Sequence, residues 1–471
     1  MSLGHSQKDG FSMQGFHEKT ALFLPLEVKK IALYLQEKGH QAYVVGGGVR
    51  DSLLKRRVLD WDLCTSAPPQ EVMVLFKRVI PTGLKHGTVT VLTSNQQGVE
   101  VTTLRKEGAY KDHRHPDQVV YTQDLKEDLA RRDFTINAMA WDPKSKILYD
   151  HFEGQKNLKE KIIKTVGNAK DRFEEDGLRS LRAIRFAAEL NFSLDQEIME
   201  AIPKTLESTQ KVAPERIKEE LMKMLGSPKP SIGLELLRKT KLMEWILPEL
   251  LEGYGMEQNK FHAFDVYHHS LKACDEADPL PLLRLAVLLH DIAKPRTRKM
   301  LRGSYRFYGH DRLGAKMAKK IMGRLRFSNN DQDYVINLVR NHMFYYQDEW
   351  SDSAVRRFIK RVGEKNLEDL LHLRVADEKA SGVNPPDYER LKVLRDHIEK
   401  IRQEESALSV KQLAISGKEV MKILGIKPGP KVGKILNELL EKVLDDPQLN
   451  EPDKLQKIVQ TYKEPTLPSR S

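Results

Sequence analysis

Cysteine is nearly absent from this sequence: only Cys64 and Cys274 occur in 471 residues. Two cysteines cannot build the disulfide framework of a small secreted domain, and such a low content suits a reducing compartment. No uninterrupted apolar run has the length of a membrane span, because LPLLRLAVLLHDIA is broken by Arg284 and His290. The polar N-terminal segment lacks the apolar centre of a secretory signal. These absences predict a soluble cytoplasmic protein that does not associate with membranes.

The composition is that of a folded protein with several domains and a positive charge. Hydrophobic residues make up 40% of the chain, which is enough to bury several cores. A chain of this length predicts about two to four domains. The formal net charge is +11 at pH 7. An excess of this size occurs on ordinary lysine-rich surfaces and on proteins that bind polyanions, so charge alone leaves both interpretations open.

Local patterns divide the chain into a mixed α/β part and a helical remainder. Stretches rich in Val and Thr predict strands, among them AYVV, LDWDLCT, GTVTVLT and GVEVTTLR. Apolar residues at helical spacing predict a helix in PLEVKKIALYLQEK. After residue 155 the pattern is helical, and seven of the fifteen histidines fall within residues 256–390.

Two aspartates stand one residue apart in the stretch LDWDLCT. Side chains alternate across a strand, so a strand here would place Asp60 and Asp62 on the same face. Adjacent carboxylates repel each other unless a cation lies between them, and Mg²⁺ commonly binds one or two carboxylates together with substrate phosphates. The pair therefore indicates a metal site for phosphoryl chemistry. The alternative is a turn in which both aspartates cap backbone amides.

A glycine-rich turn, GGGVRD (46–51), shortly precedes the aspartates. Backbone N–H groups at Gly47 and Gly48 can approach a phosphate closely, and Arg50 can donate a pair of hydrogen bonds to phosphate oxygens. A glycine turn alone is often only a tight turn, but beside paired carboxylates it indicates neighbouring phosphate and metal sites. Glu100, in the predicted strand VEVTT, is the candidate third carboxylate, although a single glutamate on a strand often just faces solvent.

Five motifs resemble those of class II tRNA nucleotidyltransferases and bacterial poly(A) polymerases. They are GGGVRDSLLKRRVLDWDLCTSA, HGTVTV, VEVTTLR, LARRDFTINAMA and FEEDGLRSLRAIRFA, and the resemblance spans residues 43–225. It implies an α+β protein with a polymerase-β-like nucleotidyltransferase head, which is a small mixed sheet with helices, followed by an all-helical neck, an HD-type body and a tail. One departure is Lys55, which stands where the family usually has glycine, at a position that we expect to shape a turn.

On this basis we predict five segments: a flexible N-terminal tail (1–22), the nucleotidyltransferase head (23–153), a helical neck with the base-selecting motif and an RNA-binding region (154–255), an HD domain (256–390) and a helical C-terminal tRNA-binding tail (391–471). Residues 105–123 resemble the flexible loop that helps complete CCA enzymes switch from C to A. The turn GIKPGPKVG (425–433) offers backbone amides and lysines to RNA phosphates, or it only joins two helices.

The resemblance implies that Asp60 and Asp62, with Glu100 as the third candidate, hold two Mg²⁺ ions in the head. A pair of metal ions suits an in-line displacement in which an RNA 3′-hydroxyl attacks and pyrophosphate leaves. Ribose recognition is implied for Arg132 and Asp133 in RRDFTINAMA, because a carboxylate can accept a hydrogen bond from a 2′-hydroxyl.

Three further residues of these motifs are candidate nucleotide ligands: Asn137, Arg182 and Arg185. The two arginines would contact the triphosphate or RNA, or they would simply lie in solvent.

Base selection is implied for Asp176 and Arg179, which we predict on one face of one helix. A carboxylate only accepts hydrogen bonds and a guanidinium only donates them. Cytosine and adenine each offer an amino donor beside a ring-nitrogen acceptor, whereas uracil and guanine offer the reverse order. A mismatch would leave buried groups unpaired, at about 1–3 kcal/mol each. The alternative is a solvated salt bridge on a helix surface.

Four stretches in the middle of the chain resemble an HD domain: VYHHS, LLHDIAKPRTR, YGHD and RNHM. The resemblance implies six metal ligands: His269, His290, Asp291, His310, His342 and Asp377. Mixed imidazole and carboxylate ligands suit Mn²⁺, Fe²⁺ or Ni²⁺. Some members hydrolyse phosphate esters with this domain, and others use the same helices only as a scaffold. Any one of these residues alone is also typical of an ordinary core or surface.

The leading hypothesis is a template-independent enzyme that adds CCA to the 3′ end of tRNA from CTP and ATP. The close alternatives are a CC-adding enzyme, an A-adding enzyme and a poly(A) polymerase, which share the head motifs. A different kind of hypothesis is that the main activity is hydrolytic: the HD domain would be a metal-dependent phosphohydrolase, and the head would be a non-catalytic RNA-binding module. The intact acidic and basic motif residues of the head favour the first hypothesis. The sequence predicts no oligomeric state.

Overall fold

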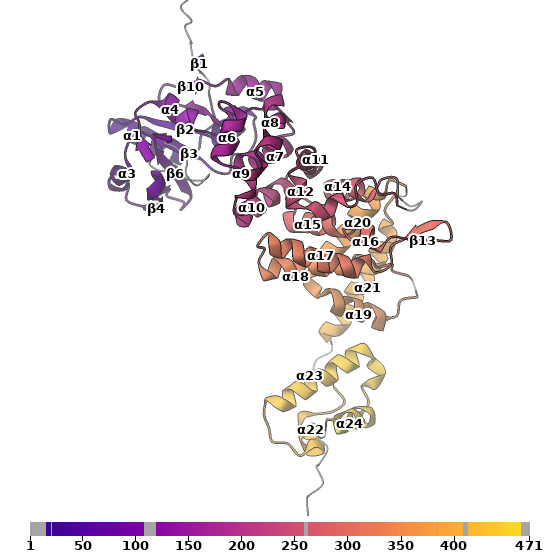
Figure 1. Ribbon diagram of the computed structural model, residues 1–471. Helices are drawn as coiled ribbons and strands as arrows, with labels where there is room; N and C mark the ends of the chain where they lie inside the picture. The colour runs from indigo at the N-terminus through magenta and orange to yellow at the C-terminus, as the bar shows by residue number, and fades with distance from the viewer. Residues whose placement is uncertain are drawn as a thin grey trace, which may run out of the picture. The chain divides into compact units, whose positions relative to one another are not determined.

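The computed structural model describes residues 16–19, 21–107, 119–258, 262–347, 349–383, 385–407 and 413–462 (Figure 1). Two compact units make up the chain: residues 1–252 with 321–327, and residues 253–320 with 328–471. The first unit carries an eight-stranded sheet. The described part of the second unit is helical apart from one hairpin, β13 (Lys299–Leu301) and β14 (Ser304–Arg306).

The sheet of the first unit has the strand order β1-β10-β9-β2-β3-β6-β5-β4. Strands β3 and β6 run parallel and the other neighbours run antiparallel, so the sheet is mixed as predicted. The strands are β1 (Phe16–Lys19), β2 (Ala42–Val45), β3 (Asp62–Thr65), β4 (Val79–Gly83), β5 (Thr88–Leu92), β6 (Gly98–Thr103), β9 (Met139–Trp141) and β10 (Ile147–Asp150).

The predicted flexible tail over residues 1–22 is wrong for residues 16–19, which form β1. This strand pairs with β10 from Phe16 opposite Asp150 to Lys19 opposite Ile147. Pairing at a sheet edge uses main-chain N–H and C=O groups, so the polar sequence FHEK can join the sheet without an alternating apolar pattern. Residues 1–15 lie outside the described residues.

The predicted flexible loop at 105–123 is described only at its ends. Strands β7 (Arg105–Glu107) and β8 (Val119–Tyr121) pair antiparallel. Residues 108–118, the centre of that predicted loop, lie outside the described residues.

The helices of the first unit follow from apolar periodicity and from proline at the first turn. In α1 the buried residues Val28, Ile31, Ala32 and Leu35 recur at the spacing of one helix face. Proline begins α3, α10 and α11, where its missing N–H costs no helical hydrogen bond. The helices are α1 (Leu26–Glu37), α2 (Gly47–Leu53), α3 (Pro69–Leu75), α4 (Leu125–Ala130), α5 (Gly154–Glu160), α6 (Ala169–Glu175), α7 (Leu178–Leu190), α8 (Gln196–Ala201), α9 (Leu206–Gln210), α10 (Pro214–Leu225), α11 (Pro230–Lys239), α12 (Met243–Ile246) and α13 (Pro248–Leu251).

The second unit is built around α15, whose residues 283–289 are all buried, as expected for a helix in the centre of a core. Helix α15 packs against α14, α18 and α20. The helices are α14 (Val266–Glu276), α15 (Pro281–Leu289), α16 (Lys294–Thr297), α17 (His310–Arg324), α18 (Asn329–Asn341), α19 (Asp352–Val362), α20 (Leu367–Ser381), α21 (Tyr388–Ala407), α22 (Gly417–Leu424), α23 (Pro430–Asp445) and α24 (Pro452–Gln460).

The last three helices, α22 to α24, share a small core of their own, which includes Val420, Leu439 and Leu455. The predicted turn between α22 and α23 is present: Gly425 ends α22 in the left-handed region, with φ 67°, and Pro430 begins α23.

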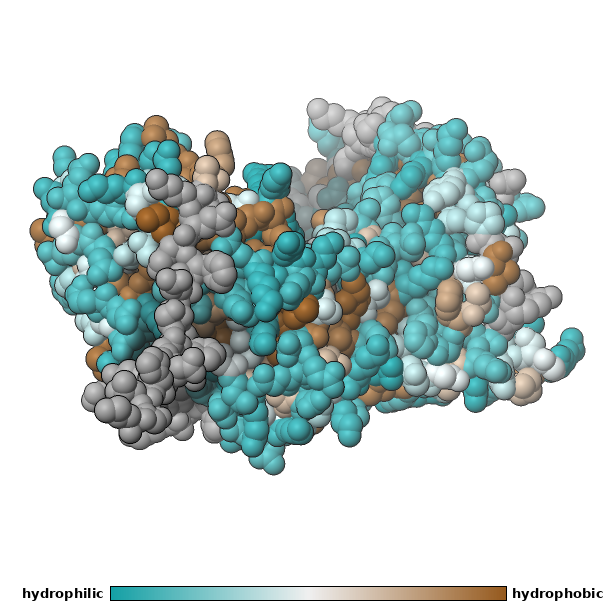
Figure 2. All heavy atoms as spheres, turned by 90° about the horizontal axis from the view of Figure 1, so that it is seen from above, coloured by the Kyte–Doolittle hydropathy of each residue, from teal (hydrophilic) through white to brown (hydrophobic). Residues whose placement is uncertain are grey.

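The architecture confirms the predicted α+β class, with a sheet-containing head followed by helices. On the face drawn in Figure 2, hydrophilic residues cover most of the surface and hydrophobic residues occupy smaller areas. Among the described residues, no helix combines the length and the apolar character that crossing a membrane requires.

Candidate functional site

A cavity of about 920 Å³ opens in the first unit, and most of the residues predicted from the head motifs line it. The predicted residues in its lining are Gly47, Arg50, Asp60, Asp62, Glu100, Arg132, Asp133, Asn137, Arg182 and Arg185. Trp61, Phe186 and Lys223 also line the cavity and were not predicted. Gly48, Asp176 and Arg179 are not part of this lining.

Asp60 and Asp62 both line the cavity, but they do not lie on one strand as predicted. Strand β3 begins at Asp62, so Asp60 precedes the strand, and the prediction that both lie on one strand is wrong. The partner of Asp62 is instead Glu100, which lies directly opposite it where β3 and β6 pair in parallel. Residues paired in this way point to the same face of a sheet, so the register brings Asp62 and Glu100 together.

The electrostatics around Asp62 favour a bound cation. Burial, opposed by Arg132 and assisted by the nearby carboxylates of Glu100 and Asp60, raises the pKa of Asp62 to about 6. A divalent cation would relieve this repulsion, and oxygen ligands suit Mg²⁺. The three carboxylates do not form a closed set of ligand atoms within 4.8 Å of one another. An open set fits an ion that takes its remaining ligands from substrate phosphates and water.

The glycine turn has two separate structural roles. Gly46 lies in the left-handed region, with φ 72°, and a Cβ there would stand 3.2 Å from Nη1 of Arg132 and 3.4 Å from Oδ2 of Asp62. Gly48 lies against Trp61, whose ring carbon Cε3 would be 2.8 Å from an added Cβ. Gly48 therefore allows close packing, and the structure does not bring it to the cavity surface as predicted.

Arg50, Asn137, Asp133 and Arg182 form a continuous chain of hydrogen bonds along the cavity. Nη1 of Arg50 donates to Oδ1 of Asn137 at 2.8 Å, and Nδ2 of Asn137 donates to Oδ1 of Asp133 at 3.1 Å. Arg182 donates from Nε and Nη2 to Oδ2 of Asp133 at 2.8 and 2.6 Å. Burial alone would raise the pKa of Asp133, but Arg182, Asn137 and the Phe134 N–H lower it to about 2.

Phe186 lies among three guanidinium groups in the cavity lining. Its ring centre is 3.9 Å from Cζ of Arg185, 4.9 Å from that of Arg50 and 5.5 Å from that of Arg182. Arg185 also donates to Glu220 and Glu189, at 2.5 Å in each case. The predicted solvated alternative is therefore wrong for Arg185, which is buried.

The prediction that Asp176 and Arg179 share one helix is wrong. Helix α6 ends at Glu175, Asp176 is extended with φ −140° and ψ 107°, and α7 begins at Leu178. A Cβ on Gly177 would stand 2.2 Å from the backbone oxygen of Ser208, so the chain needs glycine at this break. Asp176 accepts a hydrogen bond from Arg216 at 3.2 Å, and Arg179 donates to Glu175 at 2.5 Å.

The turn expected at Lys55 is present. Lys55 lies in the left-handed region, with φ 56°, just after α2. Glycine adopts this region without a steric penalty, whereas lysine does so at a cost.

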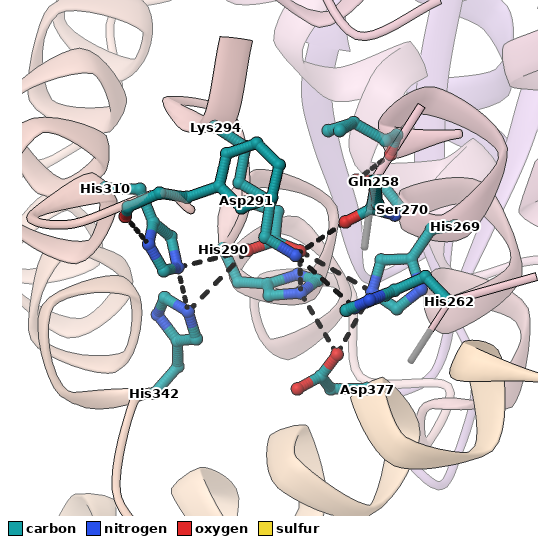
Figure 3. Close-up of polar contacts among 12 residues, drawn as sticks. Gln258, His262, His269, Ser270, His290, Asp291, Lys294, His310, His342 and Asp377 are labelled. Atoms are coloured by element: carbon teal, nitrogen blue, oxygen red, sulfur yellow. Dashed lines mark hydrogen bonds and ion pairs between the residues drawn. The ribbon is translucent and has the colours of Figure 1, made fainter. Parts of the chain in front are cut away.

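A second cluster of ionisable side chains lies inside the second unit (Figure 3). One set of possible metal ligands comprises His262, His269, Asp291 and Asp377, and another comprises Asp291, His310 and His342; in each set the ligand atoms lie within 4.8 Å of one another. Five of the six predicted residues belong to these sets. His290 lies beside them, with Nε2 3.1 Å from Oδ2 of Asp291 and 3.4 Å from Oδ1 of Asp377. His262 was not predicted; it lies seven residues before His269, ahead of α14.

Backbone hydrogen bonds fix how two of these imidazoles are protonated. Nδ1 of His310 donates to the Phe307 carbonyl and Nδ1 of His342 donates to the Val339 carbonyl, both at 2.7 Å. A carbonyl only accepts, so Nε2 of each neutral ring carries a lone pair. The two Nε2 atoms face each other at 3.1 Å, beside Asp291. Burial lowers the pKa of His342 to about 3, which disfavours a proton there and leaves a metal cation as the fitting partner.

Lys294 is the basic group closest to this cluster. Its Nζ lies 2.6 Å from Oδ2 of Asp291 and donates to Oε1 of Gln258 at 2.7 Å. The pKa of Asp291 lies well below its ordinary range because His290 and Lys294 outweigh the effect of burial. Asp291 is therefore ionised, and it belongs to both sets of possible ligands.

Three family models match the chain: the poly A polymerase head domain at residues 42–164, the "Probable RNA and SrmB- binding site of polymerase A" at residues 191–253, and tRNA nucleotidyltransferase domain 2 at residues 311–459. The chain is 32% identical to the CCA-adding enzyme of Pediococcus pentosaceus, across 90% of this chain and 95% of that protein. It is 31% identical to the CCA-adding enzyme of Staphylococcus haemolyticus, across 92% of this chain and 97% of that protein.

Among solved structures, the CCA-adding enzyme of Bacillus stearothermophilus in complex with CTP is similar, with a TM-score of 0.66 and 27% identity across 92% of this chain and 96% of that chain. The Thermotoga maritima CCA-adding enzyme complexed with tRNA shares the fold, with a TM-score of 0.51 and 20% identity.

Proposed function

The chain belongs to the CCA-adding enzyme family, and from this premise we propose that it adds C, C and A to the 3′ end of tRNA from CTP and ATP. The observation that carries the proposal is that a relative of this activity matches along 95% of its length, while the acidic, glycine and arginine motifs gather at one cavity. Two buried, unpaired cysteines suit the cytoplasm, where tRNA maturation needs CTP and ATP.

We propose that Asp60, Asp62 and Glu100 hold divalent metal ions, with Mg²⁺ as the fitting ion. Bound there, the ions would lower the barrier for attack of the RNA 3′-hydroxyl and for departure of pyrophosphate. The register of β3 and β6 fixes Asp62 opposite Glu100, so the protein presents both carboxylates without reorganisation.

The hydrogen-bonded chain from Arg50 to Arg182 positions the nucleotide. Asp133 is held ionised, and its carboxylate is offered to a ribose hydroxyl, which a deoxynucleotide would lack at the 2′ position. Arg132, anchored by Asp128 at 3.2 Å, and the arginines around Phe186 supply positive charge for the triphosphate.

Asp176 and Arg179 remain the proposed base-selecting pair, although Asp176 lies between α6 and α7 and Arg179 lies in the first turn of α7. Arg216 holds Asp176, and Glu175 holds Arg179, so each side chain has a defined direction before a nucleotide arrives. Because a carboxylate accepts and a guanidinium donates, the pair matches the donor–acceptor order of cytosine and adenine. Replacement of Arg179 by Ala is expected to admit UTP and GTP more readily.

The test uses tRNA that lacks its terminal CCA, incubated with each labelled nucleoside triphosphate. Incorporation of two C and one A supports the proposal. C alone, A alone or long A tracts would select the CC-adding, A-adding or poly(A) alternatives. Asp60→Ala is expected to abolish incorporation, whereas Glu207→Ala, which removes an exposed carboxylate of the same unit, is the matched control and should retain it.

A second candidate function is hydrolysis of phosphate esters at the histidine cluster. The observation that favours it is that Nε2 of His310 and Nε2 of His342 face each other at 3.1 Å beside an ionised Asp291. Each Nε2 carries a lone pair, and this set of nitrogen and oxygen donors fits Mn²⁺, Fe²⁺ or Ni²⁺. In such a reaction water supplies the oxygen that bonds to phosphorus and the proton that goes to the leaving alcohol, while the ester P–O bond breaks. The products are an alcohol and inorganic phosphate.

Substitutions at the two sites distinguish nucleotide addition from phosphate-ester hydrolysis. Asp291→Ala is expected to abolish release of phosphate and to spare incorporation of C and A, and Asp60→Ala should do the opposite. The matched control is Asp333→Ala, an exposed aspartate on α18. Loss of both activities in Asp291→Ala, with thermal unfolding unchanged, would contradict two independent sites.

A further inference from the structure

Four arginines and one lysine give the cavity of the first unit its positive charge, and each arginine already contacts a carboxylate of the protein. The five basic residues of the lining are Arg50, Arg132, Arg182, Arg185 and Lys223. The carboxylate partners of the arginines are Asp51 for Arg50 at 2.9 Å, Asp128 for Arg132 at 3.2 Å, Asp133 for Arg182 at 2.6 Å and Glu220 for Arg185 at 2.5 Å. Part of the charge of these four guanidinium groups is therefore balanced before a substrate binds.

Lys223, near the end of α10, is not bound to a carboxylate in this way. Its Nζ lies 3.9 Å from Oε1 of Glu220, which is beyond hydrogen-bond distance. Glu220 is buried, and its other carboxylate oxygen accepts a hydrogen bond from Nε of Arg185. The Lys223 side chain is 56% exposed. Among the described residues that line this cavity, Lys223 is thus the cation that makes no hydrogen bond to a carboxylate.

Glu220 lies among three cations, and Lys223 is the one that has no second carboxylate beside it. Glu220 and Lys223 are three residues apart in α10, so they lie on one face of this helix. Arg182 of α7 approaches the same oxygen of Glu220 as Lys223 does, also at 3.9 Å. The other carboxylate partners of the two arginines of α7 are Asp133 for Arg182 and Glu189 for Arg185. The charge of the Lys223 ammonium group is therefore available to an anion that enters the cavity.

We propose that Lys223 binds a phosphate group of a substrate in this cavity. The inference rests on the proposed addition of CCA and adds a substrate-binding residue to its site. Phosphate is the anionic group that both substrates share, because the nucleotide carries a triphosphate and the RNA carries phosphodiesters. An ammonium group is a compact charge with three donors on a flexible stem, so it can follow a phosphate that moves during the reaction. A phosphate contact at Lys223 also breaks no hydrogen-bonded ion pair of the protein.

The experiment measures addition of C to tRNA that lacks its terminal CCA, with separate determination of KM for CTP and for tRNA. In the full-length protein, Lys223→Ala is expected to raise at least one of these KM values about fivefold or more, because a charge-assisted contact to phosphate is lost. We expect kcat to change less than about twofold, since the contact is made to the bound substrate as well as to the transition state. Lys223→Arg keeps the positive charge and should restore KM to within about twofold of the wild type.

The KM that changes identifies which phosphate Lys223 binds. A higher KM for CTP assigns the contact to the triphosphate, a higher KM for tRNA assigns it to the RNA backbone, and a rise in both assigns it to both. Unchanged KM values in Lys223→Ala, a loss confined to kcat, or a loss that Lys223→Arg does not restore would each overturn the proposal.

The matched control is Lys30→Ala. Lys30 also stands three residues after a glutamate on a helix of the first unit, in this case Glu27 on α1, and its side chain is 61% exposed. It does not line this cavity. Both KM values should therefore stay at the wild-type level in Lys30→Ala.

Failure of the proposed function itself has a different signature. If the wild-type protein adds neither C nor A, equilibrium dialysis with labelled CTP and Mg²⁺, and filter binding of tRNA, still test the contact. Lys223→Ala should weaken binding of at least one of the two about fivefold or more, and Lys30→Ala should weaken neither. Equally tight binding of both by the wild type and Lys223→Ala would overturn the proposal, and a wild-type protein that binds neither would overturn it together with the proposed function.

Discussion

The ion pair between Asp133 and Arg182 is expected to contribute measurably to the stability of the first unit. Its two hydrogen bonds, at 2.8 and 2.6 Å, join α7 to the segment between α4 and β9, and the side chain of Asp133 is only 12% exposed. The perturbation is a double-mutant cycle: Asp133→Asn, Arg182→Gln and the double variant. Asparagine and glutamine keep the approximate shapes of the side chains and remove their charges.

The magnitude follows from the pKa of Asp133. A fall from 3.8 to about 2 means that the folded state favours the ionised carboxylate by about 2 kcal/mol over the unfolded state. Asn137 and the Phe134 N–H share in this effect, so Arg182 is expected to account for most of it but not for all. Asp133→Asn should lower the free energy of unfolding by about 2 kcal/mol at pH 7, because it also leaves the Arg182 guanidinium without its main partner.

The assay is urea unfolding followed by circular dichroism. A coupling energy between the two substitutions of about 1–2 kcal/mol at pH 7 is expected. Since the folded pKa lies below the ordinary value, the contribution is complete above pH 4 or so and declines as the pH falls towards about 2. A coupling below about 0.5 kcal/mol at pH 7 would refute the reasoning, because surface pairs already reach that value.

Four further outcomes are expected. Lys55→Gly should raise the free energy of unfolding by about 0.5–1 kcal/mol in urea titrations, because glycine adopts the left-handed region without the steric cost that lysine has. The greater conformational entropy of glycine in the unfolded chain offsets part of this stabilisation. Gly177→Ala should lower the melting temperature and the rate of CCA addition together, since its Cβ would meet the Ser208 backbone oxygen at 2.2 Å. Removal of divalent ions with EDTA should stop incorporation, and Mg²⁺ should restore it; addition that persists in EDTA would contradict the metal-binding role of the head carboxylates. The affinity for tRNA, measured by filter binding, should fall about tenfold or more between 50 and 200 mM salt, because phosphate contacts release counterions; a flat dependence would contradict electrostatic binding.

The sequence predicted the parts of the site that local pattern determines. Paired acidic residues, the glycine turn and the strand that carries Glu100 are short-range features, and predicted members of all three line the cavity, although Gly48 does not. The relation between Asp62 and Glu100 could not be predicted, because strand register depends on pairing between segments far apart in the chain. The break at Gly177 was missed because the spacing of Asp176 and Arg179 fits a helix equally well, although the glycine itself was a signal.

Residues that act through packing were harder to find than residues that carry charge. Phe186 looked like one more apolar position in a helix, and only the folded chain shows three arginines around its ring. His262 precedes the motif that identified the other histidines, so no spacing rule pointed to it. The edge strand β1 is polar, and its place in the sheet comes from main-chain pairing with β10.

The parallel pairing of β3 with β6 limits which insertions the loops of the head can accept, because the position of Glu100 relative to Asp62 depends on the register of these strands. A slip of one residue between these strands would turn Glu100 to the opposite face of the sheet and leave Asp62 facing a valine. Deletions or insertions between residues 93 and 98, in the turn before β6, are therefore harmless only if the strands keep their alignment. An insertion or deletion there that shifts the register would act on catalysis by separating Asp62 from Glu100.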